Sequence, residues 1–138
     1  MHPILFEWGP FTFYSYGLLI GLGFLLALFV SRRHAKRAGV DPDQVRTLVL
    51  VCLFLGLIGA RAAYVALHWG FYRSNPLEVI RFDHGGLVFY GGLLAGAAGA
   101  LGYLRRHRLP IGKMLDALTP SLALAHAIGR VGCFLNGC

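Results

Sequence analysis

Charged residues are scarce in this 138-residue chain: only 14% are Asp, Glu, Lys or Arg, whereas 57% are apolar. A soluble domain carries about 25% charged residues, and a disordered chain is poor in apolar residues and rich in charge. The composition therefore excludes disorder and argues against an ordinary soluble domain. Because a bilayer-spanning helix needs about 20 mostly apolar residues, the sequence predicts an integral membrane protein.

Acidic residues are the scarcer charged group, with 6 Asp and Glu against 13 Lys and Arg. A basic soluble protein would suggest a nucleic-acid partner, but nine of these basic residues gather in two intervals between apolar runs, 32–46 and 105–113. Lys and Arg beside a span stay on the cytoplasmic side. We therefore expect both clusters inside, and no nucleic acid as a partner.

Residues 1–10 contain no Lys or Arg. A secretory signal peptide begins with basic residues, so the first apolar run is expected to be a retained helix with its N-terminus outside. Cysteine is also rare, and three cysteines do not make a disulfide framework. The histidines are too scattered for a metal motif, and Asp116 alone cannot hold the ions of a metal-dependent phosphatidyl transferase. We expect neither a metal nor a cofactor.

Four apolar segments predict an all-α membrane domain covering residues 1–138, with transmembrane helices at about 11–30, 47–69, 85–104 and 115–134. Asp41 and Pro42 are typical of a helix start. The segment 75–78 (NPLE) predicts a further short helix, resting on the interface in the outer loop.

Glycine is plentiful, with 19 residues, and some glycines repeat at i, i+4. Gly17 with Gly21, and Gly92 with Gly96, have the small-xxx-small spacing that permits close contact between membrane helices.

Two arginines lie inside the expected spans, Arg61 in the second and Arg130 in the fourth. An arginine in hydrocarbon costs about 2.5–3.5 kcal/mol on insertion scales and is functional by default. A side chain that reaches the interface, or one that bonds backbone carbonyls of a broken helix, is the structural alternative. Tyr16 and Tyr90 are expected at similar depth in the outer half of the membrane. Since the guanidinium fork suits phosphate, the pattern favours a phospholipid headgroup site facing the outer leaflet.

Helical spacing places these arginines among other polar groups. Arg61 shares one helix face with Tyr64 and His68, and Arg130 shares another with His126 and Cys133.

Three strings resemble one known family: Gly9-Pro10 followed by Tyr16-Gly17, then 85–92 (GGLVFYGG), then 126–138 (HAIGRVGCFLNGC). Together and in this order they resemble the bacterial prolipoprotein diacylglyceryl transferases. The resemblance implies a multi-pass transferase of the bacterial inner membrane. Its implied reaction moves the diacylglyceryl group of phosphatidylglycerol to the lipobox cysteine thiol in a prolipoprotein signal peptide and releases glycerol phosphate. This is the first step of lipoprotein maturation.

The resemblance also implies roles for individual residues. Arg130 matches the signature arginine that engages the phospholipid headgroup, and Arg61 falls on an arginine of the second span in family members. Tyr16 matches an essential tyrosine of the first span. Asn136 and Gly137 match signature positions, and these three residues together with Tyr90 are expected to be catalytic.

The general base is unassigned, because Tyr90 stands where the best-known members have a histidine proposed for that role. A tyrosine of pKa about 10 is a poor base, so Tyr90 is expected to donate a hydrogen bond to a phosphate or ester oxygen. His126 is a substitute candidate for the base. Cys133 and Cys138 replace Asn and Glu of those members, and their role is open.

Family members are much longer than this chain and have further spans. The resemblance therefore predicts a product truncated inside the signature and inactive alone. A non-enzymatic alternative stays open: a small membrane protein or half-transporter that homodimerises through glycine-rich faces.

Overall fold

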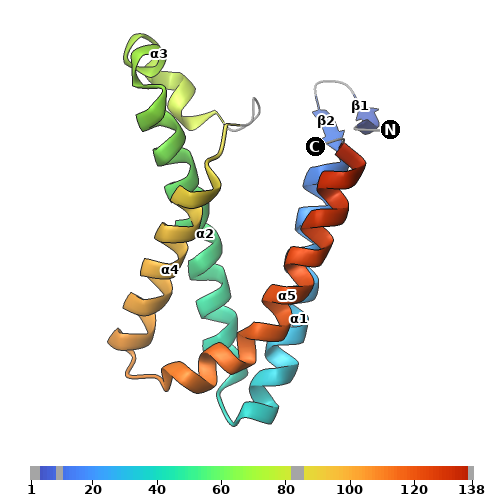
Figure 1. The fold of residues 1–138 in the computed structure, drawn as a ribbon, viewed down its shortest axis with the longest axis vertical. Coiled ribbons are helices and arrows are strands. Elements are labelled where there is room, and N and C mark those ends of the chain that lie inside the picture. The colour runs from blue at the N-terminus through green and yellow to red at the C-terminus, as the bar shows by residue number, and fades with distance from the viewer. Residues whose placement is uncertain (1–3, 9–10, 82–85, 137–138) are drawn as a thin grey trace. The chain divides into compact units, whose positions relative to one another are not determined.

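The computed structural model describes residues 4–8, 11–81 and 86–136, and it describes side chains within 18–81 and 86–134. Two antiparallel strands are followed by helices (Figure 1). The elements are β1 (Ile4–Trp8), β2 (Phe11–Tyr14), α1 (Ser15–Ala38), α2 (Pro42–Leu67), α3 (Trp69–Ser74), the 3-10 helix η1 (Pro76–Ile80), α4 (Phe89–Arg106) and α5 (Ile111–Asn136). Contacts divide the chain into two compact units, Met1–Arg46 with Ile111–Cys138, and Thr47–Pro110.

In the first unit α1 and α5 lie side by side along their length (Figure 1). They are antiparallel, because Gly23 near the start of α1 meets Ile128 near the end of α5. A Cβ added at Gly23 would lie 3.3 Å from the Ile128 side chain, whereas one at Gly21 would have nothing within 4 Å. The close contact expected at Gly21 is therefore wrong, and Gly23 makes it instead.

The end of α1 and the start of α2 follow local chemistry. Gly39 adopts a φ of +73°, and the Val40 N–H donates to the Ala35 carbonyl at 3.0 Å. This is the Schellman pattern, in which glycine at the left-handed position ends a helix. Asp41 then accepts from the Asp43 N–H at 3.0 Å, and Pro42 is the first residue of α2. The helix start predicted at Asp41 is confirmed.

The hairpin of β1 and β2 departs from the all-α expectation. Its strands pair antiparallel, with Trp8 opposite Phe11. The first helix therefore begins at Ser15 rather than at residue 11. The sequence of β2, FTFY, combines aromatic and β-branched residues, which favour strands over helices.

In the second unit α2 and α4 touch through glycines. A Cβ on Gly59 would lie 2.7 Å from the Gly91 carbonyl oxygen, and one on Gly92 would lie 3.0 Å from the Gly56 oxygen. A Cβ on Gly96 would be 3.5 Å from the Cys52 oxygen. The close approach expected for Gly92 and Gly96 is confirmed. These glycines are used inside the chain, which leaves them unavailable to a homodimer.

Within the described residues, two helical segments are long and apolar enough to cross a membrane, Leu18–Ala38 and Pro42–Leu67. By length and composition they agree with the expected membrane character. The helices α4 and α5 overlap the third and fourth predicted spans, but the count of four spans and their orientation remain predictions.

Candidate functional site

The side chain of Arg61 is buried in the second unit, at 5% exposure. In the described part of the chain its guanidinium donates to four backbone carbonyls: Nε to Val79 at 3.1 Å, Nη1 to Gly86 at 3.1 Å, and Nη2 to Glu78 at 2.7 Å and to Arg81. Four N–H groups of one guanidinium thus bond the end of η1, Arg81 directly after it and Gly86 just before α4. The geometry matches the structural alternative of an arginine bonding carbonyls, and a headgroup role for Arg61 stays a prediction.

The sequence positions these carbonyls through local turns. Pro76 begins η1, and the Arg81 N–H donates to the Glu78 carbonyl at 3.2 Å, which closes the last turn. Gly86 adopts a φ of +81°, a conformation that glycine reaches without a Cβ penalty. The Val88 N–H then donates to the Ala60 carbonyl at 3.1 Å. The start of α4 is therefore hydrogen-bonded to α2 one residue away from Arg61.

Aromatic rings cover the Arg61 guanidinium. Its Cζ lies 5.8 Å from the Tyr64 ring centroid and 5.5 Å from that of Tyr72, within the range of cation–π attraction. Tyr64 stacks on His68 with centroids 4.2 Å apart. Phe71 meets Tyr72 edge to face at 5.3 Å. The predicted grouping of Arg61, Tyr64 and His68 is thus seen in the structure, although α2 ends at Leu67 and His68 lies just beyond it, and Tyr72 joins the group from α3.

These aromatic residues and Arg61 line a pocket of about 600 Å³, together with Glu78 and Arg81. The Glu78 carboxylate and the Arg81 guanidinium form an ion pair at 3.1 Å. A second pocket of about 450 Å³, which Arg61 also lines, has an apolar lining that includes Ile58, Val65 and Trp69. The buried arginine therefore lines both an aromatic pocket that contains an ion pair and an apolar pocket.

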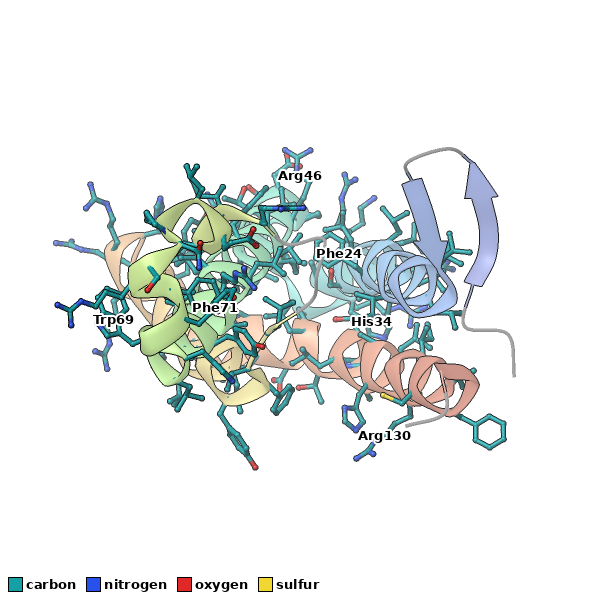
Figure 2. All side chains as sticks on the ribbon, turned by 90° about the horizontal axis from the view of Figure 1, so that it is seen from above. Phe24, His34, Arg46, Trp69, Phe71 and Arg130 are labelled. Atoms are coloured by element: carbon teal, nitrogen blue, oxygen red, sulfur yellow. The ribbon has the colours of Figure 1, made fainter. Side chains whose placement is uncertain are left out.

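Arg130 belongs to the first unit and differs from Arg61 in its burial and in its hydrogen-bond partners. Its side chain is exposed and lies on the side of α5 that faces away from α1 (Figure 2). Its Nε donates to His126 Nε2 at 3.5 Å, a long bond that needs the neutral ring with its proton on Nδ1. The structure thus brings together Arg130 and His126, with Cys133 half-buried one turn further on. The Arg130 guanidinium is open to a ligand.

Of the remaining predicted site residues, the structure describes the side chain of Tyr90, but not those of Tyr16 and Asn136 and not Gly137. Tyr90 is the second residue of α4 and is 72% exposed, with an edge contact to Phe89 at 5.7 Å. Tyr16 lies in the first turn of α1, and Asn136 is the last residue of α5; their side chains fall outside the described set. Gly137 and Cys138 lie outside the described residues. In the described part of the chain, no three His, Cys, Asp or Glu side chains gather closely enough to hold a metal ion.

The family model for prolipoprotein diacylglyceryl transferase matches residues 3–138. The chain belongs to the prolipoprotein diacylglyceryl transferase family. The resemblance inferred from the three strings is therefore confirmed, and the family match covers both structural units.

Curated relatives agree with the family match. The phosphatidylglycerol–prolipoprotein diacylglyceryl transferase of Bacillus cytotoxicus is 40% identical over 128 residues, which are 93% of this chain and 47% of the relative. The enzyme of the same name from Synechococcus elongatus is 40% identical over 134 residues, 97% of this chain and 46% of the relative. The enzyme of the same name from Bacillus licheniformis is 38% identical over 136 residues, which are 99% of this chain and 50% of the relative. The chain spans about half the length of the curated relatives it matches.

Proposed function

We propose that this chain serves in the transfer of the diacylglyceryl group from phosphatidylglycerol to the lipobox cysteine of prolipoproteins. The family match over residues 3–138 carries the proposal. In the reaction, the cysteine sulfur forms a bond to the glyceryl carbon while the bond from that carbon to a phosphate oxygen breaks. The thiol proton passes to a base, and glycerol phosphate leaves with its negative charge.

Arg130 supplies the clamp for that charge. Its guanidinium on α5 is exposed, and the bond that engages it is the long one from Nε to His126. A planar fork can bond two phosphate oxygens at once. Donors aimed at charge that develops in the transition state are the largest single catalytic contribution in many enzymes. We infer that Arg130 binds the headgroup in the ground state and stabilises glycerol phosphate as it departs.

Two exposed side chains supply the proton chemistry in this proposal. The Tyr90 hydroxyl donates a hydrogen bond to a phosphate or ester oxygen, and its exposure on α4 leaves it accessible to a lipid. His126 Nε2 accepts from Arg130, so this nitrogen can take the thiol proton once the long bond to Arg130 is released. Tyr16, Asn136 and Gly137 complete the catalytic set on the strength of the family signature alone.

The proposed setting is the bacterial inner membrane, crossed by about four helices of this chain. The N-terminus and the segment with α3 and η1 lie outside, where the phospholipid headgroups of the outer leaflet and the lipobox cysteine would meet. The basic clusters at 32–46 and 105–113 lie inside, as the preference of Lys and Arg for the cytoplasmic side requires.

The test joins this chain to the half of the Bacillus licheniformis relative that it does not match. Membranes with the fusion are incubated with labelled phosphatidylglycerol and a lipobox peptide. We expect label on the peptide, and none on a control peptide with serine in place of the cysteine. A fusion that accumulates in the membrane as well as the intact relative, yet transfers no label, contradicts the proposal.

A second measurement uses the chain by itself. Reconstituted in nanodiscs, it is expected to bind phosphatidylglycerol in preference to phosphatidylcholine. The phosphate of phosphatidylcholine is neutralised by its own choline cation, whereas that of phosphatidylglycerol is left for the arginine. Equal binding of the two lipids would contradict the headgroup site even if the fusion failed to assemble.

A further inference from the structure

Arg61 is the most heavily engaged polar side chain among the described residues. Its carbonyl partners lie 17 to 25 positions further along the chain. They belong to Glu78 and Val79 in η1, to Arg81 just after it, and to Gly86 three residues before α4. One guanidinium thus fixes both ends of the connection between η1 and α4.

The bonds leave little of the guanidinium for a lipid. An arginine has five N–H donors, and four of them donate to the carbonyls described above. Bidentate recognition of phosphate needs two parallel donors on one edge of the fork. The edge formed by Nε and Nη2 is fully occupied, and Nη1 is bonded to Gly86. At 5% exposure, Arg61 could bind phosphate only after releasing these carbonyls.

The connection is in turn shaped to fit Arg61. A Cβ on Gly86 would lie 2.6 Å from Tyr64 Cε1 and 2.9 Å from Arg61 Nη1, and the φ of Gly86 is +81°. Only glycine fits between these groups with this backbone conformation. The Val88 N–H bond to Ala60, at 3.1 Å, lies directly beyond. Arg61, Gly86 and Val88 therefore form one unit that ends at the first turn of α4, where Tyr90 stands.

We propose that Arg61 is a positioning residue: its guanidinium is the template that holds the carbonyls of Glu78, Val79 and Arg81 and that of Gly86 in place, and it thereby sets the place of Tyr90 without binding the headgroup. The role of Tyr90 rests on the proposed function, whereas the template does not. Small displacements of a group that must meet a reacting centre are costly, since about 1 Å can reduce a rate about 10²-fold.

The template is tested first without any activity, by amide hydrogen exchange of the chain in nanodiscs. Arg61→Lys removes the planar fork but keeps the charge. Gly86→Ala keeps Arg61 but adds a Cβ that would collide with the Tyr64 ring and with Arg61 Nη1. In both variants we expect the amides of 76–81 and 86–90 to exchange about tenfold faster or more, because local opening governs exchange. Matched controls are Arg73→Lys on exposed α3 and Gly70→Ala, where an added Cβ has nothing within 4 Å; neither should change exchange.

The second readout separates positioning from binding. In the fusion described above, Arg61→Lys and Gly86→Ala should lower kcat about 10²-fold while the KM for phosphatidylglycerol stays near that of the unaltered fusion. Binding of phosphatidylglycerol by the chain alone should also be unchanged in both variants.

Three outcomes would overturn the inference. Unchanged exchange with weakened phosphatidylglycerol binding in Arg61→Lys would make Arg61 a headgroup ligand. Faster exchange with unchanged kcat would reduce it to a structural residue. Unchanged exchange in Gly86→Ala would show that no template exists at the connection. A fusion that transfers nothing contradicts the proposed function and the Tyr90 step, while the exchange comparison still decides the template.

Discussion

At the scale of single residues, the two arginines that the sequence predicts inside spans have opposite surroundings. Arg61 is buried and bonded to carbonyls, whereas Arg130 is exposed on α5 with one long bond to His126. A buried guanidinium with four of its five donors bonded to the backbone can hold a fold together, and an exposed fork can bind a ligand. The same residue type therefore has two different surroundings, and the exposed guanidinium of Arg130 is the one that we propose as the phosphate ligand.

Substituting Arg130 with lysine tests its role as a clamp. Lysine keeps the charge but loses the planar fork, so transfer by the fusion should fall by about 10²–10³-fold, the cost of removing one donor to a developing oxyanion. Membrane levels should not change, because the side chain is exposed. The matched control is Arg106→Lys in the last turn of α4, which should retain full activity. Full activity in Arg130→Lys itself would remove the clamp.

Tyr90 can be tested by removing a single oxygen. At 72% exposure, Tyr90→Phe should change stability by no more than about 0.5 kcal/mol. If the hydroxyl donates to the ester, transfer should nevertheless fall by about tenfold, and if it donates to the charged phosphate, by about 10–10²-fold. The assay is transfer by the fusion, with thermal unfolding measured in parallel. Tyr103→Phe, at the other end of α4, is the control; equal effects of the two substitutions would contradict a specific role.

Sequence reasoning at this scale succeeded where the chemistry is local. The cap at Asp41 depends on residues two positions apart, and the shared face of Arg61, Tyr64 and His68 depends on helical spacing alone. The partners of Arg61 could not be predicted, because the carbonyls lie 17 to 25 positions away and every residue carries one. The sequence likewise does not show which of its 19 glycines adopts a positive φ, so the conformation of Gly86 could not be predicted.

At the scale of elements, glycine determines how closely α2 and α4 approach. A Cβ on Gly59 would lie 2.7 Å from the Gly91 oxygen, so Gly59→Ala should separate the helices and destabilise the second unit by about 1–3 kcal/mol. Gly102→Ala in α4 is the matched control, since its Cβ would have nothing within 4 Å, and it should stabilise by about 0.5–1 kcal/mol. Denaturant unfolding in detergent measures both; equal effects would contradict the close packing.

The elements also show where periodicity misleads. The i, i+4 rule selected Gly92 and Gly96 correctly but selected Gly21, which faces open space, instead of Gly23. Spacing identifies a face of a helix but does not say whether a partner covers it. The predicted first span, 11–30, wrongly includes the strand Phe11–Tyr14. Apolar residues raise the hydropathy of a segment whether it forms a helix or a strand, so hydropathy alone does not separate the two.

At the scale of the whole molecule, charge distribution predicts orientation. Five basic residues fall in 32–46 and four in 105–113, whereas Arg73 and Arg81 are the basic residues between α2 and α4. The bias in Lys and Arg between short loops sets topology. The loop with α3 and η1 must therefore face outward for the proposed headgroup site to reach the outer leaflet, and the opposite orientation would place that site on the cytoplasmic side.

Cysteine labelling in intact cells decides between these orientations. In a background with serine at Cys52, Cys133 and Cys138, a membrane-impermeant maleimide should label Leu77→Cys, because Leu77 is 80% exposed in η1. It should label Arg33→Cys, exposed near the end of α1, only after the membrane is opened. The two positions serve as controls for each other, since both are accessible once the cells are lysed. Labelling of Arg33→Cys before lysis and of Leu77→Cys only afterwards would invert the topology and, with it, remove the outer-leaflet site.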